Sequence, residues 1–384
     1  MQIRAAVLES SGLPAPYASS QPLKIRNVTL EGPGQGEVLV RIVAAGLCHS
    51  DLSVIEGKRP RPLPMVLGHE AAGVVEQLGS GVTDLAVGDH VVCVFVPSCG
   101  TCEYCCEGRP ALCTPGAAAN GKGALLSGER RLSAHDCSDH HDCGDGHLNH
   151  HLGVSAFAQY ATVARQSLVK IDRDVDLKFA ALFGCAVLTG VGAALNAANV
   201  RAGDKVAIIG LGGVGMAALL GARAAGAERI VAIDISERKL EWAREMGATD
   251  VFLATADVDE AIRDATRGGV DSALEFAGSL PALELGYRIA RRGGQLVTAG
   301  LPPPSTVLPI PAVSLVADEK TVRGSYLGSC VPARDIPRYI QLFKRGLLPV
   351  DRLLTTEYKL DDINIGFDDL REAKLLRGLI CDFD

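Results

Sequence analysis

One segment, KVAIIGLGGVG at 205–215, restricts the fold of this 384-residue chain more than any other feature. An apolar strand runs directly into Gly210, Gly212 and Gly215, and a helical pattern follows over 216–225. The first glycine permits a tight turn, the second lets the backbone approach a pyrophosphate, and the third allows close helix packing. The backbone expected to hold a dinucleotide comprises Gly210, Gly212, Gly213, Val214 and Gly215.

Strands and helices alternate from residue 205 onward, which predicts a doubly wound parallel sheet. The expected strands are 206–209, 230–234, 251–253, 272–275, 295–299 and 321–325, with helices such as 237–246 and 280–290 between them. Asp234 ends the second strand, where its carboxylate would accept both ribose hydroxyls and repel a 2′-phosphate, which favours NAD over NADP. Lys239 can lie near the same ribose, or be a solvated helix lysine. The alternative for the whole motif is a tight turn that binds nothing.

The chain before about residue 170 is different, because short β-branched runs stand between glycine and proline signals. Strands are expected at 38–43, 72–78, 90–96 and 157–163, in an irregular β-rich domain. The apolar stretch 179–200 is expected to be a buried helix. After about residue 333, two helical stretches and a last strand are expected to return to this domain. The fold class is therefore α/β, with two domains.

The composition of the chain argues against some classes of binding partner. A formal net charge of −7 argues against nucleic acid or an anionic membrane as the main partner, and 4% aromatic residues offer no base-stacking platform. The N-terminal residues do not form a signal peptide, so we expect a reducing compartment, the cytoplasm. Clustered cysteines in that setting bind metal more often than they form disulfides.

Two sets of residues are candidate metal ligands. Cys99, Cys102, Cys105 and Cys113 have the spacing C-x2-C-x2-C-x7-C, which can close a tetrahedral structural zinc site; an iron–sulfur cluster is the rival interpretation. The second set is dispersed: Cys48, His69 and Cys185 could leave a fourth zinc position open for substrate. Spacing does not join these three, and each alone fits a buried cysteine or a core histidine.

Motifs along nearly the whole chain resemble those of the zinc-dependent medium-chain alcohol dehydrogenases. They are GLCHSD (46–51), GHEAAGVV (68–75), the four-cysteine lobe, GCAVLTG (184–190), GLGGVG (210–215), AIDIS (232–236), AGLPP (299–303) and GFDDLREAKLLR (366–377). The resemblance implies a GroES-like, β-rich catalytic domain over 1–187, completed by 329–384, and a Rossmann NAD-binding domain over 188–328. The active site would lie in the cleft between them.

The resemblance also implies roles for single residues. Cys48, His69 and Cys185 would bind the catalytic zinc, with Glu70 behind it as an occasional ligand and Asp51 bonded to the other nitrogen of His69. With the four-cysteine lobe, the chain would hold two zinc ions. Cofactor contacts would come from His49 and Arg377 at the pyrophosphate, Thr189 near the nicotinamide, and Ala299; the substrate pocket would be lined by Phe95, Leu112, His151 and Leu152.

The implied reaction is oxidation of a primary alcohol, either medium-chain or aryl, to its aldehyde by NAD, and the reverse. Zinc would lower the pKa of the alcohol, the proton would leave through Ser50, and hydride would pass to the nicotinamide. The relay position three residues later, often histidine in the family, is Ser53 here. Proton release must therefore use Ser53, the cofactor ribose, water or His49.

Two other functions stay open. The first is a dehydrogenase of S-(hydroxymethyl)glutathione, although the arginine that this branch carries beyond the fourth lobe cysteine is replaced here by the stretch beginning Thr114-Pro115. The second is a non-catalytic nucleotide or redox sensor, which the intact zinc ligands and Ser50 argue against. A homodimer or homotetramer is expected, with edge strands pairing around 322–327.

The segment 133–152 is longer than is usual in the family, with the insertion centred on 137–146. It contains CSDHHDC at 137–143, so Cys137 and Cys143 could take part in a third metal site. A flexible exposed insert is the favoured interpretation, because consecutive histidines rarely place both rings on one ion.

Overall fold

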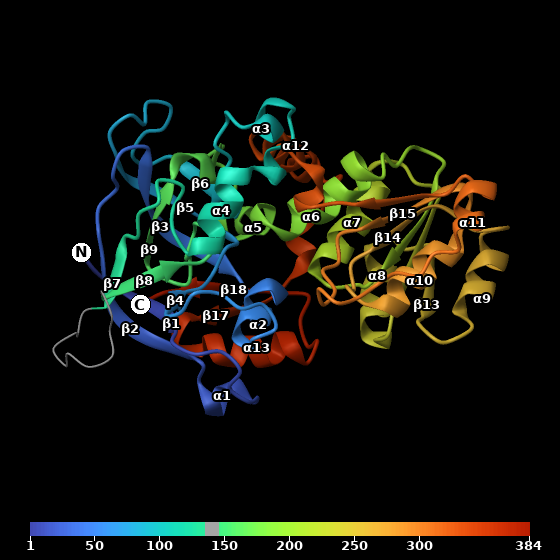
Figure 1. Cartoon of the computed structure of the whole chain (residues 1–384), viewed down its shortest axis with the longest axis horizontal. Helices are drawn as coiled ribbons and strands as arrows, with labels where there is room; N and C mark the ends of the chain where they lie inside the picture. Colours follow the sequence, from blue (N-terminus) through green and yellow to red (C-terminus); the bar gives the residue numbers. More distant parts are fainter. Residues whose placement is uncertain (135–145) are drawn as a thin grey trace. The chain divides into compact units, whose positions relative to one another are not determined.

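A computed structural model describes residues 1–134 and 146–384, so the Cys137–Cys143 motif lies outside the described residues. The chain divides into two compact units (Figure 1). The first comprises Met1–Cys185, Val331–Ile340 and Leu354–Asp384, and the second Ala186–Cys330 and Gln341–Leu353. The predicted α/β fold class, a β-rich domain together with a doubly wound parallel sheet, is confirmed.

The first unit contains a closed barrel and a seven-stranded sheet. The barrel follows the order β1 (Gln2–Leu8), β2 (Leu23–Leu30), β7 (Leu132–Ala134), β8 (His147–His150) and β4 (Met65–Val66). The sheet follows the order β10 (Leu168–Ile171), β6 (His90–Cys93), β5 (Ala71–Leu78), β3 (Glu37–Gly46), β18 (Arg377–Asp382) and β17 (Leu354–Lys359), and β9 (Tyr160–Ala164) also pairs with β3. Strand β18 pairs with the end of β3, so the C-terminal segment returns to this unit as expected.

Short helices connect the strands of the first unit. The α-helices are α1 (Tyr17–Ser20), α2 (His49–Ile55), α3 (Glu103–Cys106), α4 (Thr114–Lys122), α5 (Leu177–Ala181) and α13 (Ile363–Arg371), and the 3-10 helices are η1 (Pro110–Leu112), η2 (Arg165–Ser167), η3 (Leu182–Gly184) and η7 (Leu360–Asp362). Helix α12 (Pro332–Lys344) is divided between the two units.

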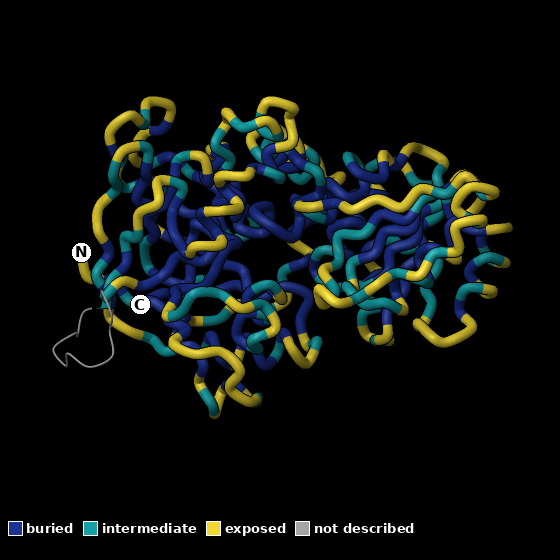
Figure 2. Tube along the Cα trace, in the orientation of Figure 1, coloured by how far each residue is buried: buried dark blue, intermediate teal, exposed yellow. Residues whose placement is uncertain are grey.

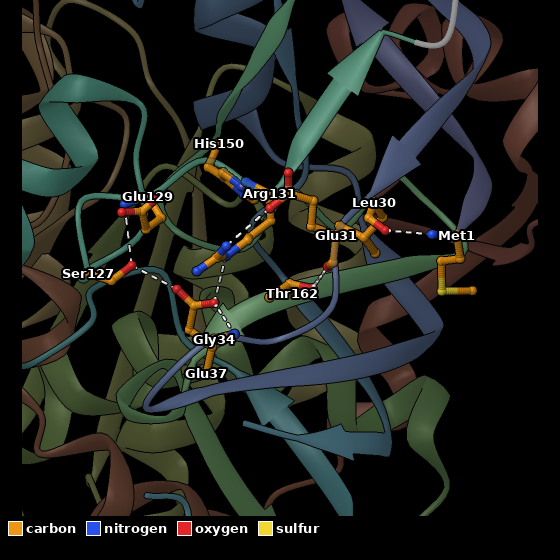
Figure 3. Close-up of polar contacts among 10 residues, drawn as sticks. All are labelled: Met1, Leu30, Glu31, Gly34, Glu37, Ser127, Glu129, Arg131, His150 and Thr162. Carbon is orange, nitrogen blue, oxygen red and sulfur yellow. Dashed lines mark hydrogen bonds and ion pairs between the residues drawn. The ribbon is translucent and has the colours of Figure 1, made fainter. Parts of the chain in front are cut away.

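A buried carboxylate ties several loops of the first unit together (Figure 3). Glu37, at the start of β3, is 1% exposed and accepts hydrogen bonds from Gly34 N at 2.8 Å, Arg131 Nε at 2.9 Å and Ser127 Oγ at 2.7 Å. Burial of a carboxylate is unfavourable unless both of its oxygens accept hydrogen bonds, as both do here. Glu37 therefore serves the fold.

The second unit is a six-stranded sheet in which every adjacent pair is parallel. Its order is β13 (Asp250–Leu253), β12 (Arg229–Asp234), β11 (Lys205–Ile209), β14 (Val270–Glu275), β15 (Ala290–Thr298) and β16 (Thr321–Gly324). This is the doubly wound order in which the crevice at the carboxyl ends of the central strands binds ligands. The tube view shows these central strands buried (Figure 2).

The remaining elements of this unit are α6 (Ala186–Gly192), the π-helical η4 (Ala193–Ala197), α7 (Gly213–Ala224), α8 (Glu237–Met246), α9 (Val258–Ala265), α10 (Leu280–Ile289), α11 (Ala312–Ala317), η5 (Leu327–Ser329) and η6 (Val350–Leu353). Among the described residues no single helix is long and apolar enough to cross a membrane. The helices Leu177–Gly184 and Ala186–Ala197, bent by 55° at the break between them, together have the length and apolar composition of a span, and nothing more than length and composition indicates one.

The structure corrects several expected boundaries. The stretch 179–200 is not one helix: it breaks at Cys185, whose φ of −140° and ψ of −72° leave the helical region. The helix expected at 216–225 begins at Gly213, because its N-cap Gly212 is already extended. The strand expected at 157–163 starts only at Tyr160, and the one expected at 295–299 starts already at Ala290.

Candidate zinc and nucleotide sites

Four buried side chains of the first unit meet at one point. The ligand atoms of Cys48, His69, Glu70 and Cys185 all lie within 4.8 Å of one another. Two thiols, an imidazole and a carboxylate at this separation fit one Zn²⁺ ion, which binds sulfur at about 2.3 Å and imidazole nitrogen at about 2.0 Å. The three residues that spacing alone could not join are therefore adjacent.

The pairing of β3 with β5 explains this convergence. Ala45 pairs with Ala71, and Gly46 N donates to Glu70 O at 2.7 Å, so the end of β3 and the start of β5 carry Cys48 and His69 to the same place. A Cβ on Gly46 would lie 2.8 Å from the Glu70 carboxyl carbon, so the close approach requires glycine.

Cys185 reaches the cluster by a second close approach. A Cβ on Gly184 would lie 2.3 Å from the carbonyl oxygen of Cys93, at the end of β6. Glycine at 184 therefore lets the helical segment press against this strand, with Cys185 next along the chain. The 3-10 helix η3 ends at Gly184, so Cys185 begins a new direction of the backbone.

The two thiols of the cluster are unlike. A hydrogen bond with Cys185 lowers the pKa of Cys48 well below its usual value, against burial, and the nearby His69 charge adds to this. The same hydrogen bond, with burial, raises the pKa of Cys185 well above its usual value. The two thiols therefore share one hydrogen bond, and a divalent cation bound by both sulfurs would displace its proton.

Asp51 supports His69 from the side away from the thiols. Its carboxylate is fully buried, lies 3.1 Å from His69 Nδ1 and accepts Gly68 N at 3.2 Å. Burial raises the pKa of Asp51, but the imidazoles of His69 and His151 outweigh it and hold the pKa below its usual value. Burial lowers the pKa of His69, but Asp51 and Cys48 raise it well above its usual value. This carboxylate–imidazole pair leaves Nε2 of His69 for a metal.

Glu70 and Arg377 form a buried ion pair, with Arg377 Nη2 against Glu70 Oε2. Both side chains are at most 3% exposed, and Arg377 also donates to Leu47 O at 3.3 Å. Burial raises the pKa of Glu70 to about 7, although Arg377 opposes the shift. Arg377 was expected at the pyrophosphate; in this structure its guanidinium is bound to Glu70.

The other predicted active-site residues surround this cluster. His49 is exposed and Ser50 half-buried in the first turn of α2, where Ser53 Oγ donates to His49 O at 2.8 Å. The Phe95 and His151 rings stand edge-on to His69, with centroids 5.4 Å and 5.6 Å away. Of the remaining two predicted pocket residues, Leu112 is half-buried in η1, and Leu152 is buried directly after His151.

The four lobe cysteines also have their sulfur atoms within 4.8 Å of one another. Backbone N–H groups point at these sulfurs: Cys99 N lies 3.2 Å from Cys113 Sγ, and Cys102 N lies 3.3 Å from Cys99 Sγ. Hydrogen bonds from Thr101 lower the pKa of Cys99 to about 6. Cys106 is exposed and donates to Thr101 O, so it is outside this set. Four thiolates with no open position make a structural-type zinc site.

In the second unit the glycine-rich turn has room for an anion. Gly210 has φ +89°, and a Cβ on Gly215 would lie 1.9 Å from Gly210 O, so neither position admits a side chain. Nothing lies within 4 Å of a Cβ built on Gly212, which leaves open space in front of the helix α7 that begins at Gly213 and Val214. These N-terminal N–H groups fit a pyrophosphate.

Asp234 lies at the end of β12 and holds this turn. Its carboxylate accepts Leu211 N at 2.6 Å and Ser236 N at 3.0 Å, and Lys239 Nζ is 3.8 Å away. Of the other predicted cofactor residues, Thr189 lies half-buried in α6, and Ala299 N donates to Glu275 O at 3.0 Å.

Comparison with known proteins decides the family. The family model for the alcohol dehydrogenase GroES-like domain matches residues 34–173, and that for the zinc-binding dehydrogenase matches 213–345. A protein of Mycobacterium tuberculosis H37Rv, provisionally named alcohol dehydrogenase D, is 40% identical over 384 residues, covering 99% of this chain and 100% of the relative. The chain belongs to the zinc-binding medium-chain alcohol dehydrogenase family.

Two further members differ in their substrates. An S-(hydroxymethyl)glutathione dehydrogenase of Synechocystis is 36% identical, covering 99% of this chain and 100% of that one. The crystal structure of benzyl alcohol dehydrogenase from Acinetobacter calcoaceticus has a TM-score of 0.90 at 36% identity, covering 100% of this chain and 99% of that one. Membership of this family makes the chain a zinc-dependent alcohol dehydrogenase with a structural-type and a catalytic-type metal site.

Sequence reasoning missed two polar groups at these sites. Asn120 Nδ2 donates to Phe95 O at 2.8 Å and so holds the bend after β6 that carries the Phe95 ring. Glu275, fully buried at the end of β14, accepts Gly278 N at 2.6 Å and Thr298 Oγ at 2.7 Å. An acidic residue ending an apolar strand was a detectable signal for Glu275, whereas Asn120 lies in a helix with no pattern pointing to Phe95.

Proposed function

We propose that this chain oxidises primary alcohols, medium-chain or aryl, to aldehydes with NAD as hydride acceptor, and catalyses the reverse reduction. The observation that carries the proposal is the meeting of Cys48, His69 and Cys185, buried and within one coordination sphere. Three such ligands leave a fourth position for the alcohol oxygen. Zinc in this position supplies a Lewis acid that lowers the pKa of the alcohol, and NAD supplies the hydride acceptor.

The residues of the chain then divide the remaining work. Asp51 holds the His69 ring and keeps Nε2 aimed at the metal. Ser50 Oγ takes the alcohol proton, and Ser53 Oγ, whose own proton is engaged by His49 O, is a poorer onward donor than water or a cofactor ribose. Phe95 helps to keep water from the site. Glu70 and Arg377 offset each other's charge behind the ligands.

Asp234 supports NAD as the preferred cofactor. A carboxylate at the end of β12 can accept ribose hydroxyls and repels a 2′-phosphate. The second candidate reaction is oxidation of S-(hydroxymethyl)glutathione, which the Synechocystis relative favours. We also propose the domain boundaries 1–187 with 329–384, and 188–328, and a homodimer or homotetramer formed through β16, whose four residues are all exposed at the sheet edge.

The test is NADH formation by the purified, zinc-supplied protein. Ethanol, hexanol, benzyl alcohol and formaldehyde are offered with NAD and with NADP, and formaldehyde both with and without glutathione. Thiol-independent oxidation of hexanol or benzyl alcohol supports the proposal. Turnover of formaldehyde only with glutathione favours the second candidate, and NADH binding without turnover of any substrate contradicts both.

A further inference from the structure

We propose that His151 is a positioning residue of the zinc site, which holds Asp51 so that Asp51 in turn fixes His69. This role rests on the proposed catalytic zinc and deepens it. It differs from the expected role of His151 as a wall of the substrate pocket.

The geometry places one carboxylate between two imidazoles. Nδ1 of His151 lies 3.0 Å from Oδ1 of Asp51, and Nδ1 of His69 lies 3.1 Å from the same carboxylate. The two rings are nearly perpendicular, at 85°. Asp51 is fully buried and both histidines are 1% exposed, so water does not replace either contact.

The buried polar atoms of this group require each other. Among the described residues, neither His151 Nδ1 nor Asp51 Oδ2 has a hydrogen bond of good geometry. An unsatisfied buried group costs about 1–3 kcal/mol, so a small rotation of the carboxylate toward His151 is favourable. Asp51 is therefore the hydrogen-bond partner that we infer for His151 Nδ1, and no other described side chain bonds this atom.

The backbone of His151 is itself held in place. His151 N donates to Ser155 Oγ at 2.9 Å, and Ser155 Oγ donates to Val66 O at 2.9 Å. These bonds join the turn after β8 to β4, within the barrel. The ring thus projects from a fixed support onto Asp51, which lies on a different segment, α2.

The chemical consequence concerns the metal. A carboxylate held by Gly68 N and one imidazole keeps some rotation about its χ2 angle, whereas a second imidazole from another segment restricts it further. His69 Nε2 then keeps its direction toward Cys48 and Cys185. Loss of a group such as Asp51, which bonds a metal ligand directly, typically costs 10- to 100-fold in metal affinity, so loss of His151, one step further back, is expected to cost about 10-fold or less.

The experiment measures metal retention in the zinc-loaded full chain. His151→Phe keeps a flat ring but removes the nitrogen, and His151→Asn keeps an N–H close to the position of Nδ1. His150→Gln is the matched control, because His150 is equally buried next to it but accepts Arg131 N at 3.0 Å. The readouts are zinc loss to a chelator, the absorption bands of cobalt at the catalytic-type site, and kcat and KM for benzyl alcohol.

We expect His151→Phe to bind the catalytic-type zinc about 10-fold more weakly and to shift the cobalt bands, with the four-cysteine zinc unchanged. In His151→Phe, kcat should fall more than KM rises. In His151→Asn, the zinc affinity should return to within about threefold of that of the parent protein. In an Asp51→Asn background the effect of His151→Phe should disappear, because the shared partner has gone.

Unchanged zinc retention and cobalt bands in His151→Phe, with only KM altered, would overturn the proposal in favour of a pocket wall. Three zinc ions per chain, one lost with His151, would instead make His151 a ligand, since Asp51, His69 and His151 also lie within 4.8 Å. If His151→Phe does not fold, His151→Leu, which also lacks the nitrogen, takes its place in the same measurements and in the Asp51→Asn background. Because zinc and cobalt are measured without turnover, failure of the proposed reaction remains distinguishable.

Discussion

Because His150 is buried, we expect the first unit to become less stable as the pH falls. Its Nε2 accepts the backbone N–H of Arg131 at 3.0 Å, so this nitrogen cannot carry a proton in the folded chain (Figure 3). Burial, with the charges of Arg130 and Arg131, lowers the pKa of His150 from 6.5 to about 3. The substitution His150→Gln tests this dependence, because the glutamine amide oxygen can accept the same N–H but does not titrate.

The direction in which pH changes the free energy of unfolding follows from proton linkage. A base whose folded pKa is depressed contributes its full stability above the unfolded pKa of 6.5, and loses it as the pH falls from 6.5 toward 3. At pH 5 the unfolded histidine is almost wholly protonated and the folded one is not, which costs about 2 kcal/mol relative to pH 7.5. For a unit of this size, that corresponds to a fall in Tm of about 4–8 °C.

The assay is thermal unfolding followed by circular dichroism at pH 7.5 and pH 5.0, with zinc present throughout. The fall in Tm between the two pH values should be about 4–8 °C larger in the parent protein than in His150→Gln. Comparing the fall within each protein removes the cost of the substitution and the titration of the zinc ligands, which both proteins share. Equal falls would refute the assignment of a depressed pKa to His150.

Three further predictions concern the second unit. Asp234→Gly should raise the ratio of kcat/KM for NADP to that for NAD at least tenfold, as initial rates will measure; an unchanged ratio would contradict the role of this carboxylate. Gly212→Ala should fold normally but bind NADH about tenfold more weakly by fluorescence titration, since its Cβ enters open space; Gly215→Ala should fail to fold, because its Cβ meets Gly210 O at 1.9 Å. Val322→Lys, on the exposed edge strand, should lower the molar mass by light scattering, whereas an unchanged mass would place the interface elsewhere.

The Rossmann unit was readable from sequence because its signals are local. Helix α8 was predicted at its observed bounds, Glu237–Met246, since an amphipathic run ends at Gly247 with φ +108°. Strand β15 was predicted to start five residues too late, because Ala290–Gly294 is polar and glycine-rich and becomes a strand only beside β14. Tertiary pairing there overrides the local preference.

The first unit was less readable because its contacts are long-range. Strand β4, Met65–Val66, has two residues and exists only because β1 and β8 flank it. Cys48, His69 and Cys185 were joined by family resemblance, not by spacing, since the close approaches at Gly46 and Gly184 leave no periodic pattern. The contact of His151 with Asp51 joins a turn after β8 to α2, and nothing in either segment indicates it.

In the proposed enzyme, Cys48, His69 and Cys185 hold a catalytic zinc distinct from the four-cysteine zinc. Zinc content and benzyl alcohol oxidation are measured together for the parent protein, Cys48→Ala and Cys99→Ala. We predict two zinc ions in the parent protein, and one in Cys48→Ala with its four-cysteine lobe intact and NADH formation lowered at least 1,000-fold. Cys99→Ala should lose the other zinc, and its main defect should be a lower thermal stability. Two zinc ions and parental turnover in Cys48→Ala would show that Cys48 does not hold a catalytic zinc.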